Sequence, residues 1–261
     1  MTRVQKLPIS VTLIAHNEEE RLPRCLESIQ DWVQEIIIVI NNCTDKTREI
    51  GERFGALIYE HEWQGHRDQK NIALQYASQD WVLALDADEE VSPSLKSEIF
   101  EFINQDCNSF AGARFPRKVW FMGKWILHGD WYPDYNLRLF KNGSGKWRGS
   151  REHDKMVVEG PIKKLKSDLH HYSNPSLNHQ IEKINYFSDI FLQRQLDNKK
   201  KWSAASTLFR AFWRFFRCYF IRLGFLDGYA GFYIASLAGF STLVRYTRLY
   251  EYNLKHSSKI E

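Results

Sequence analysis

The chain has 261 residues, of which 43% are hydrophobic, so it can form one large domain or one domain with an appendage. Its four cysteines lie far apart without a CxxC pair, which argues against a zinc-knuckle pattern and a disulfide framework and favours reduced thiols in a cytosolic protein. The net charge of +4 is small, and the basic residues gather among Phe and Trp near the C-terminus, which disfavours a nucleic-acid-binding protein.

The first 90 residues alternate between predicted strands and predicted helices. Apolar and β-branched runs predict strands over 9–15, 35–40, 56–59 and 81–85. Apolar residues at helical spacing predict a helix that ends near residue 30 and two more over 46–54 and 67–77. This alternation is typical of βαβ units, so we expect an α/β fold in which helices cover both faces of a parallel sheet.

Asp86 and Asp88 follow the last of these strands in the sequence WVLALDADEE. Residues i and i+2 of an extended chain point to the same side, so the two carboxylates can converge, and they repel each other unless a cation or a shared proton lies between them. Mg²⁺ or Mn²⁺ accepts oxygen ligands and often shares its shell with substrate phosphates, which makes this pair a candidate metal site. The alternative is a solvated acidic turn before a helix that begins at Ser92-Pro93.

Polar turns follow three of the predicted strands, at 16–20, 41–45 and 86–90. Ligands of parallel α/β sheets bind beyond the carboxyl ends of the strands, so we expect these turns to form one site at one edge. Between residues 112 and 172, short aromatic and β-branched runs alternate with Gly-rich turns, which we interpret as irregular β structure that completes the pocket.

From about residue 176 the sequence predicts helices, so we expect an α/β domain over 1–175 and a helical region over 176–261. An apolar stripe lies beside a basic stripe at helical spacing: Phe209, Trp213, Phe216, Phe220 and Leu223 beside Arg210, Arg214 and Arg217. Such a helix is typical of the surface of an anionic membrane, and the alternative is a helical hairpin packed on the catalytic domain or on a second subunit. The uncharged stretch 228–244 is at the short limit for spanning a bilayer.

Eight segments follow one another in this order: ISVTLIAHNEEE, NCTD, GHRDQKNIAL, DWVLALDADEEV, HGDWYPDYNLRLF, HDK, LHHYS and WRFFRCYFIRLGFLDG. In this order, which covers nearly the whole chain, they resemble bacterial family-2 glycosyltransferases of lipopolysaccharide core synthesis, in particular the β-1,4-glucosyltransferase branch. It implies a GT-A fold, a nucleotide-sugar donor such as UDP-glucose, Mg²⁺ or Mn²⁺, and inversion at the anomeric carbon. It also implies a lipid A-core acceptor.

The resemblance assigns roles to particular residues. The nucleotide sugar would be bound by Asn17, Glu18, Asn41, Asp45, Gln69, Lys70 and Asp86, and the metal by Asp86, Asp88 and His171. Lys70 would oppose the charge of the donor phosphates. Ile40 occupies a position where the family often has an aspartate, so Asn41 is expected to substitute for it.

The reaction needs a carboxylate that takes a proton from the attacking sugar hydroxyl. Asp154, in HDK, occupies the position where the family commonly has Glu after His, so we predict it to be the base. Asp134 in WYPD is the rival, and Asp130 is the third candidate. The predicted acceptor contacts are Trp131, Tyr132, Arg138 and Arg151.

Two other functions stay open at this point. The same fold could act on a polyprenyl-linked sugar or a capsule precursor, or the chain could be a non-catalytic, membrane-docked sugar-nucleotide-binding protein, which the missing aspartate at Ile40 favours. The apolar run near the N-terminus is too short for a signal peptide, so we expect a cytoplasmic protein that is peripheral on the inner membrane.

Overall fold

The computed structural model describes residues 6–150, 153–173, 177–198 and 202–257. The chain divides into two compact units. The first contains residues 1–118 and 134–172, and the second contains residues 119–133 and 173–261. The segment 119–133, which the sequence placed in the α/β domain, thus groups with the C-terminal helices.

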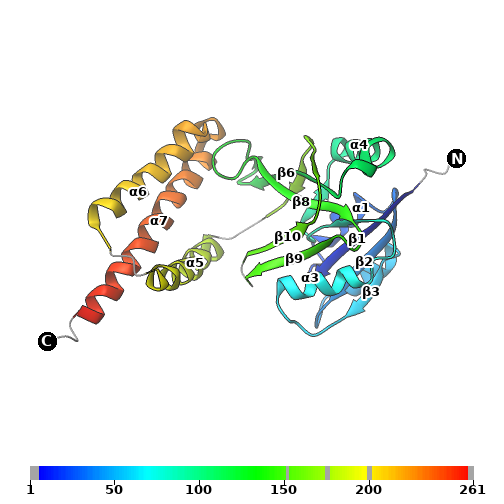
Figure 1. Ribbon diagram of the computed structural model, residues 1–261, viewed down its shortest axis with the longest axis horizontal. Helices are drawn as coiled ribbons and strands as arrows, with labels where there is room; N and C mark the ends of the chain where they lie inside the picture. Colours follow the sequence, from blue (N-terminus) through cyan, green and yellow to red (C-terminus); the bar gives the residue numbers. More distant parts are fainter. Residues whose placement is uncertain (1–5, 151–152, 174–176, 199–201, 258–261) are drawn as a thin grey trace. The chain divides into compact units, whose positions relative to one another are not determined.

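The first unit is built on a sheet with the strand order β3-β2-β1-β4-β8-β6-β12-β5 (Figure 1). Four strands pair in parallel: β1 (Leu7–Ala15), β2 (Val33–Ile40), β3 (Leu57–Glu60) and β4 (Trp81–Ala84). Two long strands then continue the sheet in the antiparallel sense, β8 (Asp134–Lys141) beside β4 and β6 (Gly112–Phe121) beside β8. The far edge holds an antiparallel pair, β12 (Leu169–His171) and β5 (Glu89–Val91). This arrangement confirms the predicted α/β fold class.

The remaining strands are short or stand apart from this order. β11 (Ile162–Lys164) and β7 (Lys124–Trp125) pair with β6, and β9 (Gly145–Ser150) forms a separate hairpin with β10 (His153–Val158). The first unit contains the α-helices α1 (Leu22–Glu27), α2 (Thr47–Arg53), α3 (His66–Gln75) and α4 (Pro93–Glu101), and a π-helical turn, η1 (Phe102–Asp106), and a 3₁₀ turn, η2 (Cys107–Ser109), follow α4. Ser92 caps α4 as expected, because its hydroxyl accepts a hydrogen bond from the Leu95 amide at 3.1 Å.

Strand β4 is buried on both faces, as its continuous apolar run predicts. Trp81 and Leu83 belong to the main core, which α1 and α4 also line. Val82 and Ala84 belong to a second cluster on the other face, together with Trp147 from β9. All four β4 side chains are at most 4% exposed, so the point where the strand ends is fixed by packing on both sides.

The second unit contains α5 (Leu177–Asp197), α6 (Ala204–Phe216) and α7 (Gly228–Ser257). A π-helical turn, η3 (Arg217–Ile221), and a 3₁₀ turn, η4 (Gly224–Asp227), connect α6 to α7. This unit has its own core, which includes Ile126, Cys218 and Ile234. The connection between α6 and α7 and one face of α7 therefore pack within this unit.

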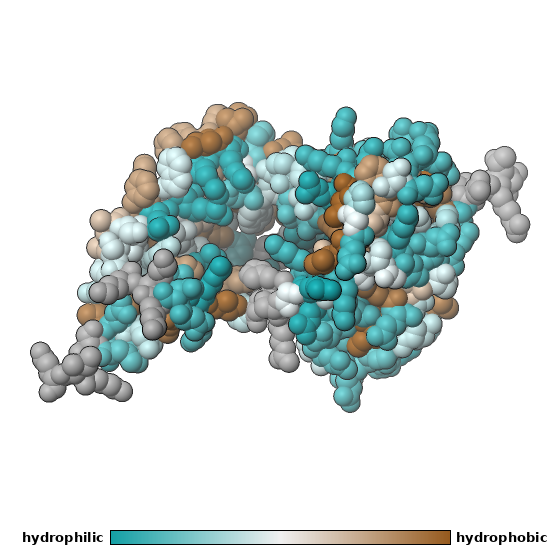
Figure 2. All heavy atoms as spheres, viewed as in Figure 1, coloured by the Kyte–Doolittle hydropathy of each residue, from teal (hydrophilic) through white to brown (hydrophobic). Residues whose placement is uncertain are grey.

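Large apolar side chains also remain on the surface of this unit. Leu208, Phe209 and Phe212 of α6 are 62% to 66% exposed, and Figure 2 shows hydrophobic residues gathered along the outer edge of α6. Within the described part of the chain, no helix combines the length and hydrophobicity that crossing a bilayer requires.

Candidate active site

The polar turns after β1 and β2 are joined by hydrogen bonds. Asn17 adopts a left-handed backbone conformation, with φ of 55°, and its side-chain oxygen accepts a hydrogen bond from the Thr44 amide at 2.8 Å. The Glu18 amide donates to the Thr47 hydroxyl at 2.7 Å. Parallel pairing of these strands places both turns at one edge of the sheet, as expected.

Three predicted nucleotide-binding residues anchor the backbone around these turns. Asp45 accepts hydrogen bonds from the Glu19 and Thr47 amides, both at 3.0 Å. Partial burial alone would raise the pKa of Asp45, but the hydrogen bonds from Thr47 and Glu19 have the larger effect, and the pKa of Asp45 is lowered. The side-chain amides of Asn41 and Gln69 both donate to the carbonyl of His61, at 3.0 and 3.4 Å. Their predicted contacts with the nucleotide stay predictions.

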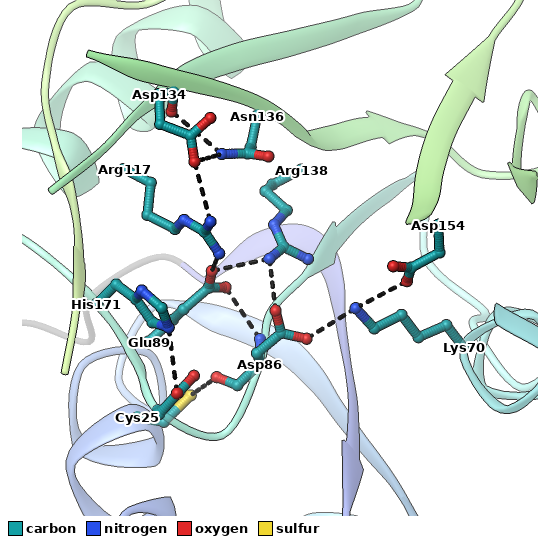
Figure 3. A network of polar contacts seen from close by, with 11 residues as sticks. Cys25, Lys70, Asp86, Glu89, Arg117, Asp134, Asn136, Arg138, Asp154 and His171 are labelled. Atoms are coloured by element: carbon teal, nitrogen blue, oxygen red, sulfur yellow. Dashed lines mark hydrogen bonds and ion pairs between the residues drawn. The ribbon is translucent and has the colours of Figure 1, made fainter. Parts of the chain in front are cut away.

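Asp86 lies between two cations at the end of β4 (Figure 3). Lys70 of α3 places its Nζ 2.9 Å from Asp86 Oδ1, and Arg138 of β8 places its Nη2 2.6 Å from Asp86 Oδ2. Burial alone would raise the pKa of Asp86, but the charges of Arg138 and Lys70 outweigh it and hold this pKa well below its usual range. Asp86 is therefore ionised at neutral pH, and both of its oxygens are engaged.

Lys70 also contacts the predicted base. Its Nζ lies 3.1 Å from Asp154 Oδ2, so one ammonium group joins the carboxylates of β10 and of the turn after β4 (Figure 3). The same ammonium lies 4.5 Å from the ring centre of Trp147, over its face. This ring holds the lysine by a cation–π contact in a place where its side chain is only 13% exposed.

Arg138 connects Asp86 to a buried network of charged side chains, and two of its members, Glu89 and Arg117, were not predicted from the sequence. Arg138 donates to Glu89 Oε1 at 2.8 Å, and Glu89 Oε2 accepts from the Asp86 amide at 3.0 Å. Arg117 lies 3.6 Å from Glu89 and 2.9 Å from Asp134. Glu89 is only 1% exposed, so its charge depends on these arginines. An arginine within an apolar strand, as in FPRKVWF, is the signal that could have identified Arg117.

Asp88 points away from this network and toward His171. Its Oδ2 lies 3.1 Å from His171 Nε2, and its backbone carbonyl accepts from the Tyr172 amide at 2.9 Å. Burial raises the pKa of Asp88, but the hydrogen bond and charge of His171 lower it by more. The pKa of Glu18 is raised, mainly by burial and also by the nearby charge of Asp88, while Arg21 acts in the opposite direction. The carboxyl ends of β1 and β4 thus bring two acidic side chains together.

At this edge of the sheet, one pair of side chains could bind a divalent cation. Among the described residues, no group of three or more His, Cys, Asp or Glu side chains is arranged to hold a metal. Asp88 and His171 form a pair, and Mg²⁺ or Mn²⁺ needs only one or two protein ligands when substrate phosphates complete its shell. The pair fits that use. Asp86, expected as a third ligand, is directed to Lys70 and Arg138 instead.

The predicted acceptor contacts are dispersed. Arg138 is buried in the network, and Arg151 lies outside the described residues. Trp131 belongs to the second unit, where it packs edge-to-face on Phe121 with ring centres 5.1 Å apart. Tyr132 is half-buried in the same unit. The roles of these residues as acceptor contacts stay predictions.

The sequence is similar to those of glycosyltransferases. A sequence model described as Glycosyl transferase family 2 matches residues 10–160. An uncharacterized glycosyltransferase of Rickettsia typhi is 30% identical over 263 residues, which cover 97% of this chain and 90% of the relative. The lipopolysaccharide core biosynthesis glycosyltransferase LpsC of Rhizobium meliloti is 29% identical over 233 residues, which cover 86% of this chain and 83% of LpsC.

The fold is also similar to a solved structure. S. aureus TarS 1–349, crystallised in complex with UDP-GlcNAc, matches with a TM-score of 0.50 and 13% identity, over 96% of this chain and 92% of TarS 1–349. At that identity the likeness concerns the fold alone. Together with the sheet order and the family match, it confirms the expected GT-A fold.

The buried network generates a prediction about stability. Arg138→Met leaves Asp86 and Glu89 without their shared cation, so we expect it to lower the free energy of unfolding by about 3–5 kcal/mol. Arg117→Met is the matched control, because Arg117 is 26% exposed and Glu89 would keep Arg138; we expect about 1 kcal/mol. Denaturant unfolding of both variants measures the difference. Equal losses would show that Arg138 is not the central cation.

Proposed function

The chain belongs to glycosyl transferase family 2, and we propose that it transfers glucose from UDP-glucose to the inner core of lipopolysaccharide, with inversion at the anomeric carbon. The similarity to LpsC over most of both chains supports this class of acceptor. The observation that carries the proposal is the position of Lys70, which contacts Asp86 and Asp154 at once. A group suited to phosphates and a group suited to proton transfer are thus neighbours at the sheet edge.

Lys70 would bind the donor. A nucleoside diphosphate carries negative charge that competes with Asp86 and Asp154 for the ammonium group. Lys70 is held over Trp147 and is little exposed, so it pays a small entropic cost when it binds a phosphate. Binding of the donor phosphate would draw Lys70 away from Asp154 and leave that carboxylate free to accept a proton.

Asp154 would act as the base. The attacking sugar hydroxyl approaches the anomeric carbon from the face opposite the leaving nucleoside diphosphate, and its proton passes to the carboxylate. Asp154 is 21% exposed and forms an ion pair with Lys70, which the donor can displace. Asp134 is held by Arg117 and by the Asn136 side chain at 3.0 Å, so it is less available. These contacts favour Asp154 over its rival.

Asp88 and His171 would hold a Mg²⁺ or Mn²⁺ ion, with the donor diphosphate in the rest of its shell. When bound, the ion would neutralise the charge that develops on the leaving diphosphate. Asp86 would fix Lys70 and the end of β4. Asn17 and Glu18, on the neighbouring turn, lie where the nucleoside of the donor is expected.

We place the enzyme on the cytoplasmic surface of the inner membrane, where nucleotide sugars and a lipid-anchored acceptor are both accessible. The exposed apolar side chains of α6 support a peripheral mode of attachment. Their exposure at 62% to 66% leaves apolar area that a lipid surface could cover.

Incubation of the purified protein with a panel of nucleotide sugars and purified lipopolysaccharide core tests the proposal. We expect transfer of one hexose from UDP-glucose, detected by mass spectrometry, and loss of one hexose from the core of a deletion strain. Transfer to a polyprenyl-linked sugar and not to the core would replace the proposed acceptor. Donor binding without transfer or hydrolysis would favour a non-catalytic protein.

Asp154→Asn should lower kcat by about 10² to 10⁴-fold with little change in donor Kd, because the amide cannot accept the proton. Asp134→Asn is the matched control, and we expect it to keep most of its kcat. Single-turnover kinetics and donor titrations measure the two effects separately. The opposite pattern would assign the base to Asp134.

Asp88→Ala should weaken Mn²⁺ binding in the presence of UDP by at least about tenfold and reduce metal-dependent transfer, because the site loses its only carboxylate ligand. Asp80→Ala, an exposed aspartate at the other end of β4, is the control and should bind Mn²⁺ normally. Titration calorimetry gives the metal affinity without turnover. Unchanged Mn²⁺ affinity in Asp88→Ala would contradict the assignment.

A further inference from the structure

The second unit contains a buried carboxylate that faces three arginines. The side chain of Asp130 is only 7% exposed. Arg214 lies 2.9 Å from its Oδ2, while Arg222 and Arg217 lie 3.1 and 3.3 Å from its Oδ1. Asp130 was the third candidate for the catalytic base, but three surrounding arginines indicate a different role, which is to hold positive charge in place.

The loop that carries Asp130 is fixed to the turns after α6. The Gly129 amide donates to the Arg222 carbonyl at 2.9 Å. Asp227, which is 3% exposed, accepts from the Leu127 and His128 amides at 3.1 and 2.8 Å. These contacts fix the position of Asp130 relative to η3, so the arginines that face it are held in a defined geometry.

The cluster has more positive charge and more hydrogen-bond donors than Asp130 can satisfy. Three guanidinium groups face one carboxylate, which leaves an excess of two positive charges. Within the described part of the chain, only Arg217 makes an aligned hydrogen bond to Asp130. Arg214 and Arg222 are 43% and 48% exposed, so their remaining N–H groups can reach a ligand. A tetrahedral anion with several oxygens suits this geometry.

Apolar side chains surround the cluster along the chain. Phe220 and Ile221 lie between Arg217 and Arg222 in the sequence, and Leu223 follows Arg222. These three side chains are 44% to 56% exposed. Phe225 and Leu226 continue this surface. Charged groups that bind phosphate beside exposed apolar groups match the boundary between lipid headgroups and acyl chains.

We propose that Arg214, Arg217 and Arg222, held in place by Asp130, bind the phosphomonoester group of a membrane lipid. This site differs from the free basic stripe of Arg210, Arg214 and Arg217 that helical spacing predicts. Arg210 instead donates to the Ser206 hydroxyl at 3.0 Å and lies over the ring of Tyr246. The inference concerns attachment to lipid and does not depend on the proposed transfer reaction.

Flotation with vesicles tests the site without donor or acceptor. We compare phosphatidylcholine vesicles that contain phosphatidic acid with vesicles that contain phosphatidylglycerol at the same surface potential. We expect at least tenfold tighter binding to phosphatidic acid and weak binding to phosphatidylcholine alone. Arg222→Gln should abolish this preference, whereas Arg210→Gln, the matched control on α6, should weaken binding to both anionic vesicles equally and by about fivefold at most.

Two further variants separate a phosphate site from diffuse attraction. Asp130→Asn removes a negative charge, so diffuse attraction would strengthen binding to both anionic vesicles. Loss of the positioning carboxylate should instead remove the preference for phosphatidic acid. Arg222→Lys keeps the charge and should also reduce that preference, because it loses the guanidinium fork. Thermal melts identify any variant that fails to fold.

Three results would overturn the inference. The first is equal binding of the wild-type protein to both anionic vesicles. The second is equal effects of Arg222→Gln and Arg210→Gln. The third is complete displacement from phosphatidic acid vesicles by millimolar inorganic phosphate while phosphatidic acid in detergent fails to compete, which would assign the cluster to a free anion.

Discussion

The first unit depends on one buried cation, Arg138, which lies between the carboxylates of Asp86 and Glu89. Two carboxylates at the end of a strand that is packed on both faces cannot stay ionised without a partner, because the protein interior solvates charge poorly. The partner comes from β8, whose antiparallel pairing with β4 matches Leu139 with Leu83 and so brings Arg138 to the turn that follows β4. The ion cluster and the extension of the parallel sheet by antiparallel strands therefore require each other.

This dependence explains what the sequence could predict. The βαβ order, the buried strand at 81–84 and the shared edge of the polar turns follow from local periodicity, and the structure has all three. The ion pairs of Asp86 do not follow from local periodicity. Arg138 lies 52 residues after Asp86 and Lys70 lies 16 residues before it, and only the fold brings them together. The Asp-Ala-Asp spacing suggested that the two carboxylates converge on one site. The structure separates them, with Asp86 on cations and Asp88 on His171.

The C-terminal region shows a second limit of periodicity. A continuous α-helix from 209 to 223 would place Arg210, Arg214 and Arg217 in one exposed stripe. The structure instead ends α6 at Phe216 and continues with a π-helical turn over Arg217–Ile221, which changes the angle between successive side chains. Arg214 from α6, Arg217 from the turn and Arg222 directly after the turn all reach Asp130, while Arg210 donates to Ser206. Helical spacing correctly grouped Arg214 with Arg217, but it could not show that Asp130, far earlier in the chain, lies against both of them and Arg222, or that Arg210 contacts Ser206 and Tyr246 instead.

The charges of the two proposed sites suggest two ways of binding a phosphate group. At the edge of the sheet, the carboxylates of Asp86, Glu89, Asp134 and Asp154 contact only three cations, Lys70, Arg117 and Arg138 (Figure 3), and Asp88 adds a fifth carboxylate beside His171. This excess of negative charge would repel a diphosphate, so a divalent cation at Asp88 and His171 would be needed to make binding of the donor favourable. Around Asp130 the excess is positive, and a phosphate there needs no metal. On this argument, a chelator should release the nucleotide sugar and leave the protein on the lipid, because the two phosphate groups are held by opposite balances of charge.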